Sequence, residues 1–431
     1  MMRGGERRPP PPPAAAFFLM QNDALIPHLF RTEYRKIVSV LCRLFGLQYI
    51  EVAEDIVSDT FLLAAETWGK KGLPPNPTAW LYTVSKNKAK DHLKHSAVFA
   101  GKVVPELLRT TETAESIQID LSPENINDSQ LRMMFAICHP AIPVEAQIGL
   151  SLNILCGFGA EEIADAFLST KETIYKRLGR AKQKLREEAI RVELPGPTEI
   201  DARLETVLRT IYLLFSEGYY SSSANTPLRR DLCVEAMRLN VMLVENEQTN
   251  TPEANALLSL MCFHASRFDA RLDTKGDIVL YEEQDEALWS TELIEKGNHY
   301  LKESTSAPRL SKYHLEASIA YWHTATKDSK EKWENILQLY NRILQIEYSP
   351  IAALNRTYAL SKANGKEEAI AEAEKLQLVE NHLYHSLLGN LYTGLDNEKA
   401  IQHYRLASAL ARTASEKTLL DGYVARLMGR K

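Results

Sequence analysis

Lysine and arginine side chains cluster in residues 161–186, EEIADAFLSTKETIYKRLGRAKQKLR. Ala164 belongs to a first expected helix, residues 168–170 can form a turn, and Ile174 follows ten residues after Ala164. This spacing is typical of a helix-turn-helix, in which two helices pack at a steep angle across a short turn. Glycine is common at the turn position that Leu168 occupies, so the motif is imperfect.

The second helix of this motif carries side chains that suit nucleic acid. Ile174 and Leu178 take the buried face, so the first turns can reach base edges while later cations meet phosphate. The spacing alone leaves a solvated basic helix as the alternative. The residues expected near base edges are Lys171, Glu172, Thr173, Lys176, Arg177 and Arg180, and those expected at phosphates are Lys182, Lys184 and Arg186.

Apolar residues at helical spacing surround this motif and predict an all-α fold. The periodicity runs over residues 23–95, is lost over residues 96–127, and returns over residues 128–191 before the LPGP sequence ends it. The interrupted stretch is rich in acidic residues and long for a loop inside a compact domain. We therefore expect two small helical domains joined by a linker.

Further helices are expected after residue 197, and two late segments resemble each other. GKEEAIAEAEKL at residues 365–376 and NEKAIQHYRLAS at residues 397–408 place Ala369 over Ala400. Small residues let paired helices approach closely, and stacking buries a face that one hairpin cannot bury alone. Although the spacing is short of the tetratricopeptide period of about 34 residues, we expect a large tetratricopeptide-like helical domain.

Charge is divided unevenly along the chain. Through Glu193 there are 24 Lys+Arg against 23 Asp+Glu, which leaves 27 against 33 for the remainder of the 51 and 56 in the whole chain. The basic cluster thus lies in a near-neutral part, while the acidic C-terminal part suits protein partners or regulation.

The remaining composition indicates a cytoplasmic protein without a metal or other cofactor. Five cysteines are scattered without a CxxC pair, as in a reduced compartment. No apolar run approaches the ~20 residues that a membrane span needs, so no membrane interaction is expected. The proline-rich residues 1–19 are interpreted as a disordered leader, with Met20 as the expected natural start.

Residues 128–186 resemble region 4 of the sigma-70 family, specifically its extracytoplasmic-function group. Their sequence is DSQLRMMFAICHPAIPVEAQIGLSLNILCGFGAEEIADAFLSTKETIYKRLGRAKQKLR. EVAEDIVSDTFLLAAETW at residues 51–68 resembles region 2.2, and NPTAWLYTVSKNKAKDHLK at residues 76–94 resembles regions 2.3 and 2.4. Two motifs in the order of this family, separated by a linker, are far more specific than either motif alone.

The resemblance implies a transcription initiation factor that binds core RNA polymerase, through its β′ clamp and β flap, and promoter DNA. The helix-turn-helix residues named above, with Lys184, would recognise the minus-35 element. The positions that match polymerase contacts are Glu54, Asp55, Ser58 and Asp59, where Ser58 replaces a common glutamine; those that match minus-10 contacts are Lys86, Asn87, Lys88 and Lys90.

Three C-terminal segments resemble the extension of a subgroup in which a tetratricopeptide-like domain is fused to the sigma domains. They are RTIYLLFSEGYYSSS, RRDLCVEAMRL and SPIAALNRTYAL, at residues 209–223, 229–239 and 349–360. The resemblance implies a built-in regulatory domain that could receive a regulatory protein or ligand. The expected domains are region 2 at 20–95, a linker at 96–127, region 4 at 128–192 and the helical extension at 193–431.

Two other classes of protein fit parts of this pattern. A one-component helix-turn-helix regulator with a helical-repeat sensor would not need residues 51–94, and a protein-interaction scaffold would bind no DNA. An enzyme fits least, because no phosphate-binding loop, nucleophile motif or metal constellation is present in the sequence.

Overall fold

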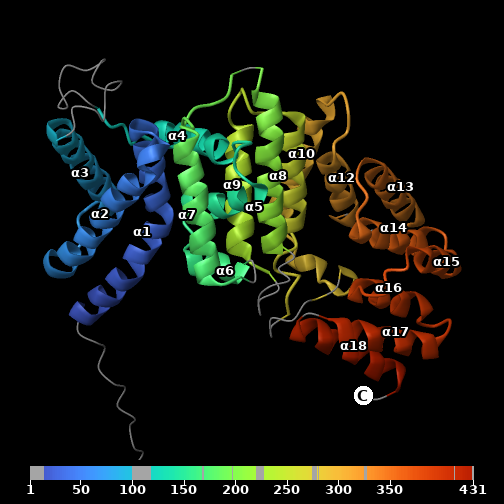
Figure 1. Cartoon of the computed structure of the whole chain (residues 1–431). Coiled ribbons are helices and arrows are strands. Elements are labelled where there is room, and N and C mark those ends of the chain that lie inside the picture. The colour runs from blue at the N-terminus through green and yellow to red at the C-terminus, as the bar shows by residue number, and fades with distance from the viewer. Residues whose placement is uncertain are drawn as a thin grey trace, which may run out of the picture. The chain divides into compact units, whose positions relative to one another are not determined.

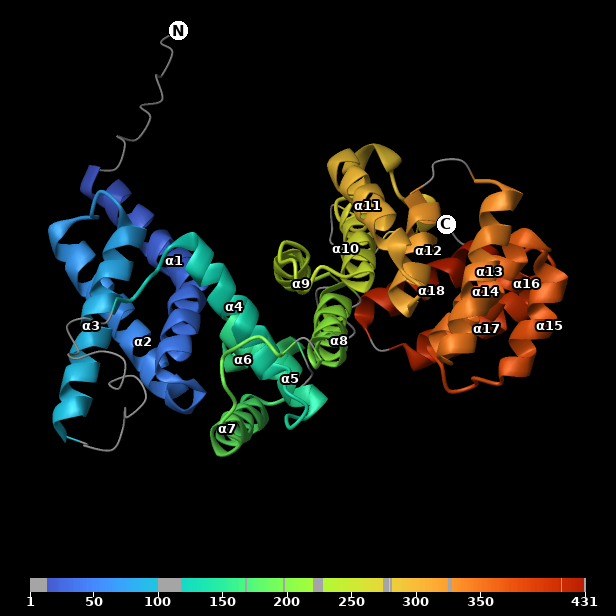
Figure 2. The same cartoon turned by 90° about the horizontal axis from the view of Figure 1, so that it is seen from above.

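The computed structural model of the chain is built from α-helices, and its described residues contain no strand. This confirms the predicted all-α fold. Figures 1 and 2 show the helices from two directions. The structure describes residues 14–99, 118–166, 169–196, 198–219, 228–273, 279, 281–324, 328–411 and 413–429.

Three long helices open the chain: α1 (Ala14–Phe45), α2 (Ile50–Lys71) and α3 (Pro77–Phe99). The periodic apolar residues of α1 are buried where this helix packs against α2. Between them Gly46 has a φ of 93°, which glycine adopts without a Cβ clash. The chain therefore reverses over a single 3₁₀ turn, η1 (Leu47–Tyr49).

Four shorter helices follow: α4 (Pro123–Ile137), α5 (Val144–Leu150), α6 (Ala160–Ala166) and α7 (Lys171–Glu187). A π-helical segment, η2 (Ser151–Leu155), extends α5. Helices α6 and α7 lie where the sequence predicts the two helices of the helix-turn-helix. Ala164 and Ile174 are both buried, as that motif requires, whereas Leu168 in the turn lies outside the described residues.

The chain divides into two compact units, and the boundary falls within α8 (Ile200–Tyr219). The first unit comprises residues 1–207 apart from 166–168, and the second begins its long continuous part at Leu208. In the first unit, Arg203 Nη2 donates a hydrogen bond to the Phe135 carbonyl at 2.9 Å. This bond holds the start of α8 against α4, so the first unit extends beyond residue 192.

The second unit is centred on α10 (Pro252–Ala265), which is buried along almost its entire length. A helix that is apolar on all sides requires neighbours on all sides, and α10 packs against three helices. They are α9 (Arg230–Val244), α11 (Thr291–Glu303) and α12 (Lys312–Thr324), with 3₁₀ turns η3 (Tyr281–Glu283), η4 (Glu286–Leu288) and η5 (Ser304–Ser306) along the same stretch.

The last helices of the second unit pack one after another, and α14 also contacts α16. Ala369 and Ala400, which the sequence aligns, are fully buried. At Gly389 an added Cβ would lie 2.8 Å from the Tyr404 ring, so glycine permits the close approach of α16 and α17. These helices are α13 (Lys330–Ile346), α14 (Pro350–Ala363), α15 (Lys366–Leu376), α16 (His382–Tyr392), α17 (Asn397–Leu410) and α18 (Ala414–Leu427).

Helix ends differ from the predicted boundaries in two places. Helix α1 begins at Ala14, inside the leader predicted over residues 1–19, because the sequence AAAFFLM favours a helix; residues 1–13 lie outside the described residues. Helix α3 also runs to Phe99, and α4 begins at Pro123 because Ser122 caps it. Helix therefore occupies both ends of the predicted linker, while residues 100–117 lie outside the described residues.

Candidate nucleic-acid interface

Helix α7 presents most of the predicted base-reading residues to solvent. Lys171, Glu172, Thr173, Lys176 and Arg180 are exposed, and Arg177 and Lys184 are half-buried. Thr170 caps the helix, since its Oγ1 accepts a hydrogen bond from the Thr173 backbone N at 3.2 Å. Burial of the opposite side fixes the rotation of the helix. That buried side consists of Ile174, Leu178, Ala181 and Leu185.

The cations on this surface differ in their partners. Lys171 Nζ lies 3.3 Å from Glu161 on α6, and Lys184 Nζ lies 2.6 Å from Glu188, the residue that follows α7. The hydrogen bonds and charges of these carboxylates raise the pKa of both lysines. In the described part of the chain, Lys176, Arg177 and Arg180 form no ion pair. Their charge is therefore available to an external anion.

Helix α2 places the predicted polymerase-binding residues beside one another, but their surroundings differ. Asp55 and Ser58 are exposed, and the Ser58 Oγ lies 3.4 Å from the Tyr34 hydroxyl of α1. Asp59 lies 3.4 Å from the Lys88 Nζ of α3. Glu54 is half-buried and already engaged by a cation from α7. Three of the four predicted residues are thus open to a partner.

Helix α3 carries the predicted minus-10 residues. Asn87 is exposed, while Lys86, Lys88 and Lys90 are half-buried. The loop before this helix ends at Asn76, whose Oδ1 accepts a hydrogen bond from the Ala79 backbone N at 2.9 Å. This cap orients the start of α3, and the Asn87 amide is left with a donor and an acceptor at the surface.

Trp80 contacts the protein core and also reaches the surface. Its ring meets Trp68 edge-on with centroids 5.3 Å apart, and Trp68 is buried whereas Trp80 is only half-buried. This contact packs the Trp80 ring against a residue of the protein interior.

Within the first unit, α7 and α2 are joined by ion pairs that the sequence did not indicate. Lys182 Nζ lies 2.6 and 2.8 Å from the two carboxylate oxygens of Glu54, with 14% and 22% of the two side chains exposed. Arg186 Nη1 lies 2.8 Å from Glu51 Oε2. Lys182 and Arg186, which we expected at phosphates, therefore contact carboxylates in this structure.

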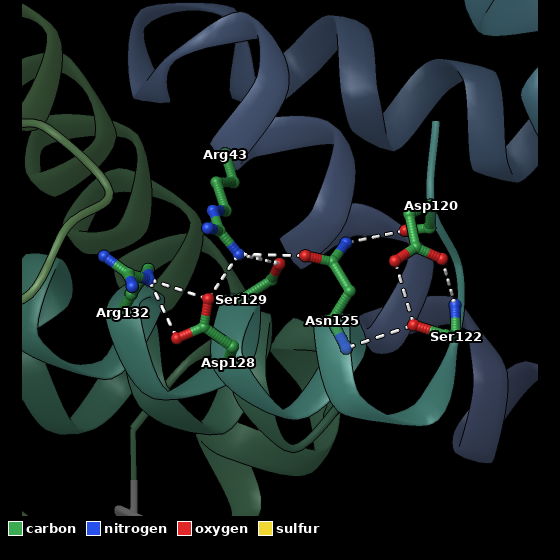
Figure 3. A network of polar contacts seen from close by, with 7 residues as sticks. All are labelled: Arg43, Asp120, Ser122, Asn125, Asp128, Ser129 and Arg132. Carbon is green, nitrogen blue, oxygen red and sulfur yellow. Dashed lines mark hydrogen bonds and ion pairs between the residues drawn. The ribbon is translucent and has the colours of Figure 1, made fainter. Parts of the chain in front are cut away.

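A second polar network joins α1 to α4, as Figure 3 shows. Arg43 Nη1 donates to Asp128 Oδ2 at 2.5 Å and to Asn125 Oδ1 at 3.0 Å. Arg132 Nε lies 2.9 Å from both oxygens of the same Asp128. The guanidinium of Arg43 thereby connects α1 to the first turns of α4.

Sequence reasoning missed these contacts because no local signal carries them. Arg43 and Asp128 are 85 residues apart, and Glu54 and Lys182 are 128 residues apart. Opposite charge alone does not identify which residues form an ion pair, because many other acidic and basic residues along the chain could also pair.

No helix in the described ranges is both long and apolar enough to cross a bilayer. Among the same residues, no three His, Cys, Asp or Glu side chains gather where they could hold a metal ion. The five cysteines are buried and unbridged.

In a comparison with known proteins, two family models match parts of this chain. Residues 29–97, which span most of α1 to α3, match the family model of sigma-70 region 2. Residues 203–305 match a family of unknown function, DUF6596. An uncharacterized protein of Rhizobium meliloti (strain 1021), R00370, is 33% identical over 372 residues, which cover 85% of this chain and 88% of that protein. No solved structure matches the chain.

Proposed function

We propose that this chain is a sigma-70 transcription initiation factor. The premise is that it belongs to the family of the R00370 protein and carries a sigma-70 region 2 domain. It binds core RNA polymerase and directs it to promoters, and it has no catalytic role of its own. The observation that carries the proposal is the match of residues 29–97 to sigma-70 region 2. Such a factor acts in the cytoplasm, where polymerase and DNA are found.

Polymerase binding is assigned to the outward face of α2. Asp55, Ser58 and Asp59 follow one another at helical spacing and are exposed, with Leu62 one turn further on at 60% exposure. Carboxylates beside an apolar side chain suit a basic coiled coil such as that of the β′ clamp. Region 4 would contact the β flap.

Promoter recognition is divided between α3 and α7. Asn87 and the neighbouring lysines of α3 would hold an unstacked base of the minus-10 element and its phosphates. Lys176, Arg177 and Arg180 of α7 would reach base edges of the minus-35 element, where a good contact contributes about 1–3 kcal/mol of discrimination. The exposure of Lys176 and Arg180 supports this assignment.

The second unit is assigned a regulatory role, as in the extracytoplasmic-function subgroup with a tetratricopeptide-like extension. Its stacked helices α13–α18 offer a broad surface, and the acidic balance of the C-terminal part suits a protein or a ligand rather than DNA. Removing this unit should change promoter output while the first unit stays folded.

Transcription in vitro with matching core polymerase tests the central proposal. The full chain should be inactive alone and should give promoter-dependent transcripts with the polymerase. A one-component regulator would instead bind its DNA without polymerase and leave polymerase unbound. Failure to bind core polymerase from the source organism contradicts the proposal.

A truncation after Val207 tests the regulatory role better than one near residue 192. It keeps Arg203 and its hydrogen bond to the Phe135 carbonyl, and it ends where the first compact unit ends. Thermal unfolding of the truncated chain is the control for its integrity. Equal transcription by the truncated and full chains, in cells and in vitro, would remove the regulatory role.

A further inference from the structure

Basic side chains gather in the interior of the second unit, around the ring of Tyr281 on η3. The Cζ of Arg267 and the Nζ of Lys332 each lie 5.3 Å from the centroid of this ring. Arg267 is 7% exposed and Lys332 is 2% exposed. Arginine and lysine are rarely buried to this extent unless a group of opposite charge accompanies them.

Arg267, two residues after the end of α10, has no carboxylate partner among the residues that the structure describes. Its Nη2 donates to the Tyr219 hydroxyl at the long distance of 3.5 Å, and its Nε is buried without a hydrogen-bond partner. The nearby acid of η3, Glu282, is already engaged by Lys362 of α14. A buried cation that lacks an anion is unfavourable, so Arg267 calls for one.

Two other buried polar atoms beside the Tyr281 ring also have no hydrogen-bond partner within the described ranges. They are the Trp289 Nε1 and the His323 Nδ1. The Trp289 ring stacks on Tyr281 with centroids 6.3 Å apart, and the His323 ring meets Tyr281 edge-on at 4.8 Å. An indole N–H can only donate, and a neutral imidazole can donate from Nδ1. Because buried polar groups are almost always hydrogen-bonded, this surplus of donors indicates an acceptor that binds among them.

The two histidines of this cluster experience the same positive charge. Burial, Arg267 and Lys332 lower the pKa of His323 to about 3. Burial and the guanidinium groups of Arg267 and Arg271 hold the pKa of His264 well below its usual range. Both imidazoles are therefore neutral at pH 7, and the permanent charges around them are cations. An anion would be stabilised by the field that keeps these rings neutral.

We propose that Arg267, Trp289, His323 and Lys332, gathered around Tyr281, form a binding site for a compact phosphate-type anion, either inorganic phosphate or the phosphomonoester group of a small molecule. Such an anion accepts hydrogen bonds at several oxygens, and its double charge matches one arginine and one lysine. A carboxylate carries a single charge and would leave one of the two cations unbalanced.

The site would connect two parts of the second unit. Arg267 and Trp289 belong to the segment that matches DUF6596, whereas His323 and Lys332 lie beyond it on α12 and α13. A bound anion would therefore hold the DUF6596 segment against the first of the later helices. Its regulatory meaning rests on the proposed function, but binding itself needs neither polymerase nor DNA.

Calorimetric titration of the full chain tests the site. Sodium phosphate should saturate one site per chain, whereas sodium chloride and sodium acetate at equal ionic strength should not, because equal ionic strength removes general screening as an explanation. Glycerol 3-phosphate separates the two sources of the anion. If it binds at least about tenfold more tightly than phosphate, the ligand is a phosphomonoester, and the reverse order indicates inorganic phosphate. If neither anion binds, the inference is overturned.

Two variants connect binding to the cluster. Arg267→Gln should weaken phosphate binding at least about tenfold, because a hydrogen bond between charged groups is lost. Trp289→Phe keeps an aromatic ring and removes only the N–H donor, so it should weaken binding about threefold. Arg356→Gln is the matched control, since Arg356 already meets Asn341 and Glu372, and it should leave affinity unchanged.

Thermal unfolding with and without phosphate distinguishes a ligand site from ordinary packing. Phosphate should raise the unfolding temperature of the unmodified chain, because a ligand that binds only the folded state stabilises it, and the rise should be smaller for Arg267→Gln. If Arg267→Gln lowered stability equally in both buffers and both variants bound phosphate normally, the arginine would serve packing alone and the inference would fail. Phosphate binding by a chain that does not bind core polymerase would remove the proposed function and leave the site. Polymerase binding without phosphate binding would do the reverse.

Discussion

Different forces hold the junction between α2 and α7, which are far apart in the sequence, and the packed helices α16 and α17, which follow one another. The junction relies on ion pairs between partly exposed side chains, such as Arg186 with Glu51. The later pair buries Leu388, Leu391 and Ala400 almost completely. Salt and a competing partner weaken charge pairs at a surface, whereas buried apolar contacts are lost only when the helices that form them unfold. The contact between α2 and α7 is therefore the one expected to separate without unfolding, whereas α16 and α17 should stay packed.

The largest effect should come from the apolar core of the second unit. Leu388→Ala removes a side chain that is 1% exposed and should lower the free energy of unfolding by about 2–5 kcal/mol. Leu395→Ala is the matched control, because Leu395 is 51% exposed, and it should change stability by less than about 0.5 kcal/mol. Urea unfolding measures both, and equal losses would show that this region is not held by its core.

A buried carboxyl in the second unit gives a pH-dependent effect. Burial raises the pKa of Glu316 to about 7, although Lys312 and a hydrogen bond from Tyr212 favour its charged form. The folded state therefore keeps the proton longer than the unfolded state, whose pKa is near 4.5. Stability from this group is present below about pH 4.5 and is lost as pH rises to about 7.

Glu316→Gln should remove this dependence. Relative to the unmodified chain, the variant should gain up to about 3 kcal/mol of stability between pH 4.5 and pH 8. Unfolding by urea at the two pH values measures the difference, with Glu331→Gln on α13, whose side chain is exposed, as the control. A constant difference across this range would contradict the raised pKa.

The free and paired cations of α7 should differ in DNA binding. Lys176→Ala and Arg177→Ala should each weaken binding to the cognate minus-35 element by about 1–3 kcal/mol. Lys184→Ala should weaken binding to all sequences and lower the salt slope by about one. Titrations of the polymerase complex with cognate and scrambled DNA compare them. If all three variants lost affinity equally on both DNAs, α7 would not read bases.

The smallest effect concerns salt at the junction. Raising ionic strength from about 0.05 M to about 0.5 M should weaken the α2–α7 contact by about 1 kcal/mol. The rate at which a short bismaleimide joins the two thiols of a Glu51→Cys, Arg186→Cys variant measures how firmly this contact is held. The packing of Leu388 and its neighbours should not change with salt. Cross-linking that does not respond to salt would mean that apolar contacts hold the junction.

Local patterns were sufficient where neighbours along the chain decide the structure. The period of Ile174 and Leu178 correctly predicted which side of α7 is buried, because a helix places residues three and four apart on one side. The same reasoning aligned Ala369 with Ala400, and both are fully buried. The start of α1 at Ala14 is harder to predict, because a proline run directly precedes residues with helix propensity.

The sequence by itself determined the helices, the buried faces and the positions of the residues expected to contact polymerase and DNA. Only the tertiary structure decided which of those side chains are open and which are engaged. Lys176 and Lys182 are the same residue type on one helix, yet the first is exposed and the second contacts Glu54. An ion pair between residues 128 positions apart depends on how whole helices pack, and no spacing within either helix contains that information.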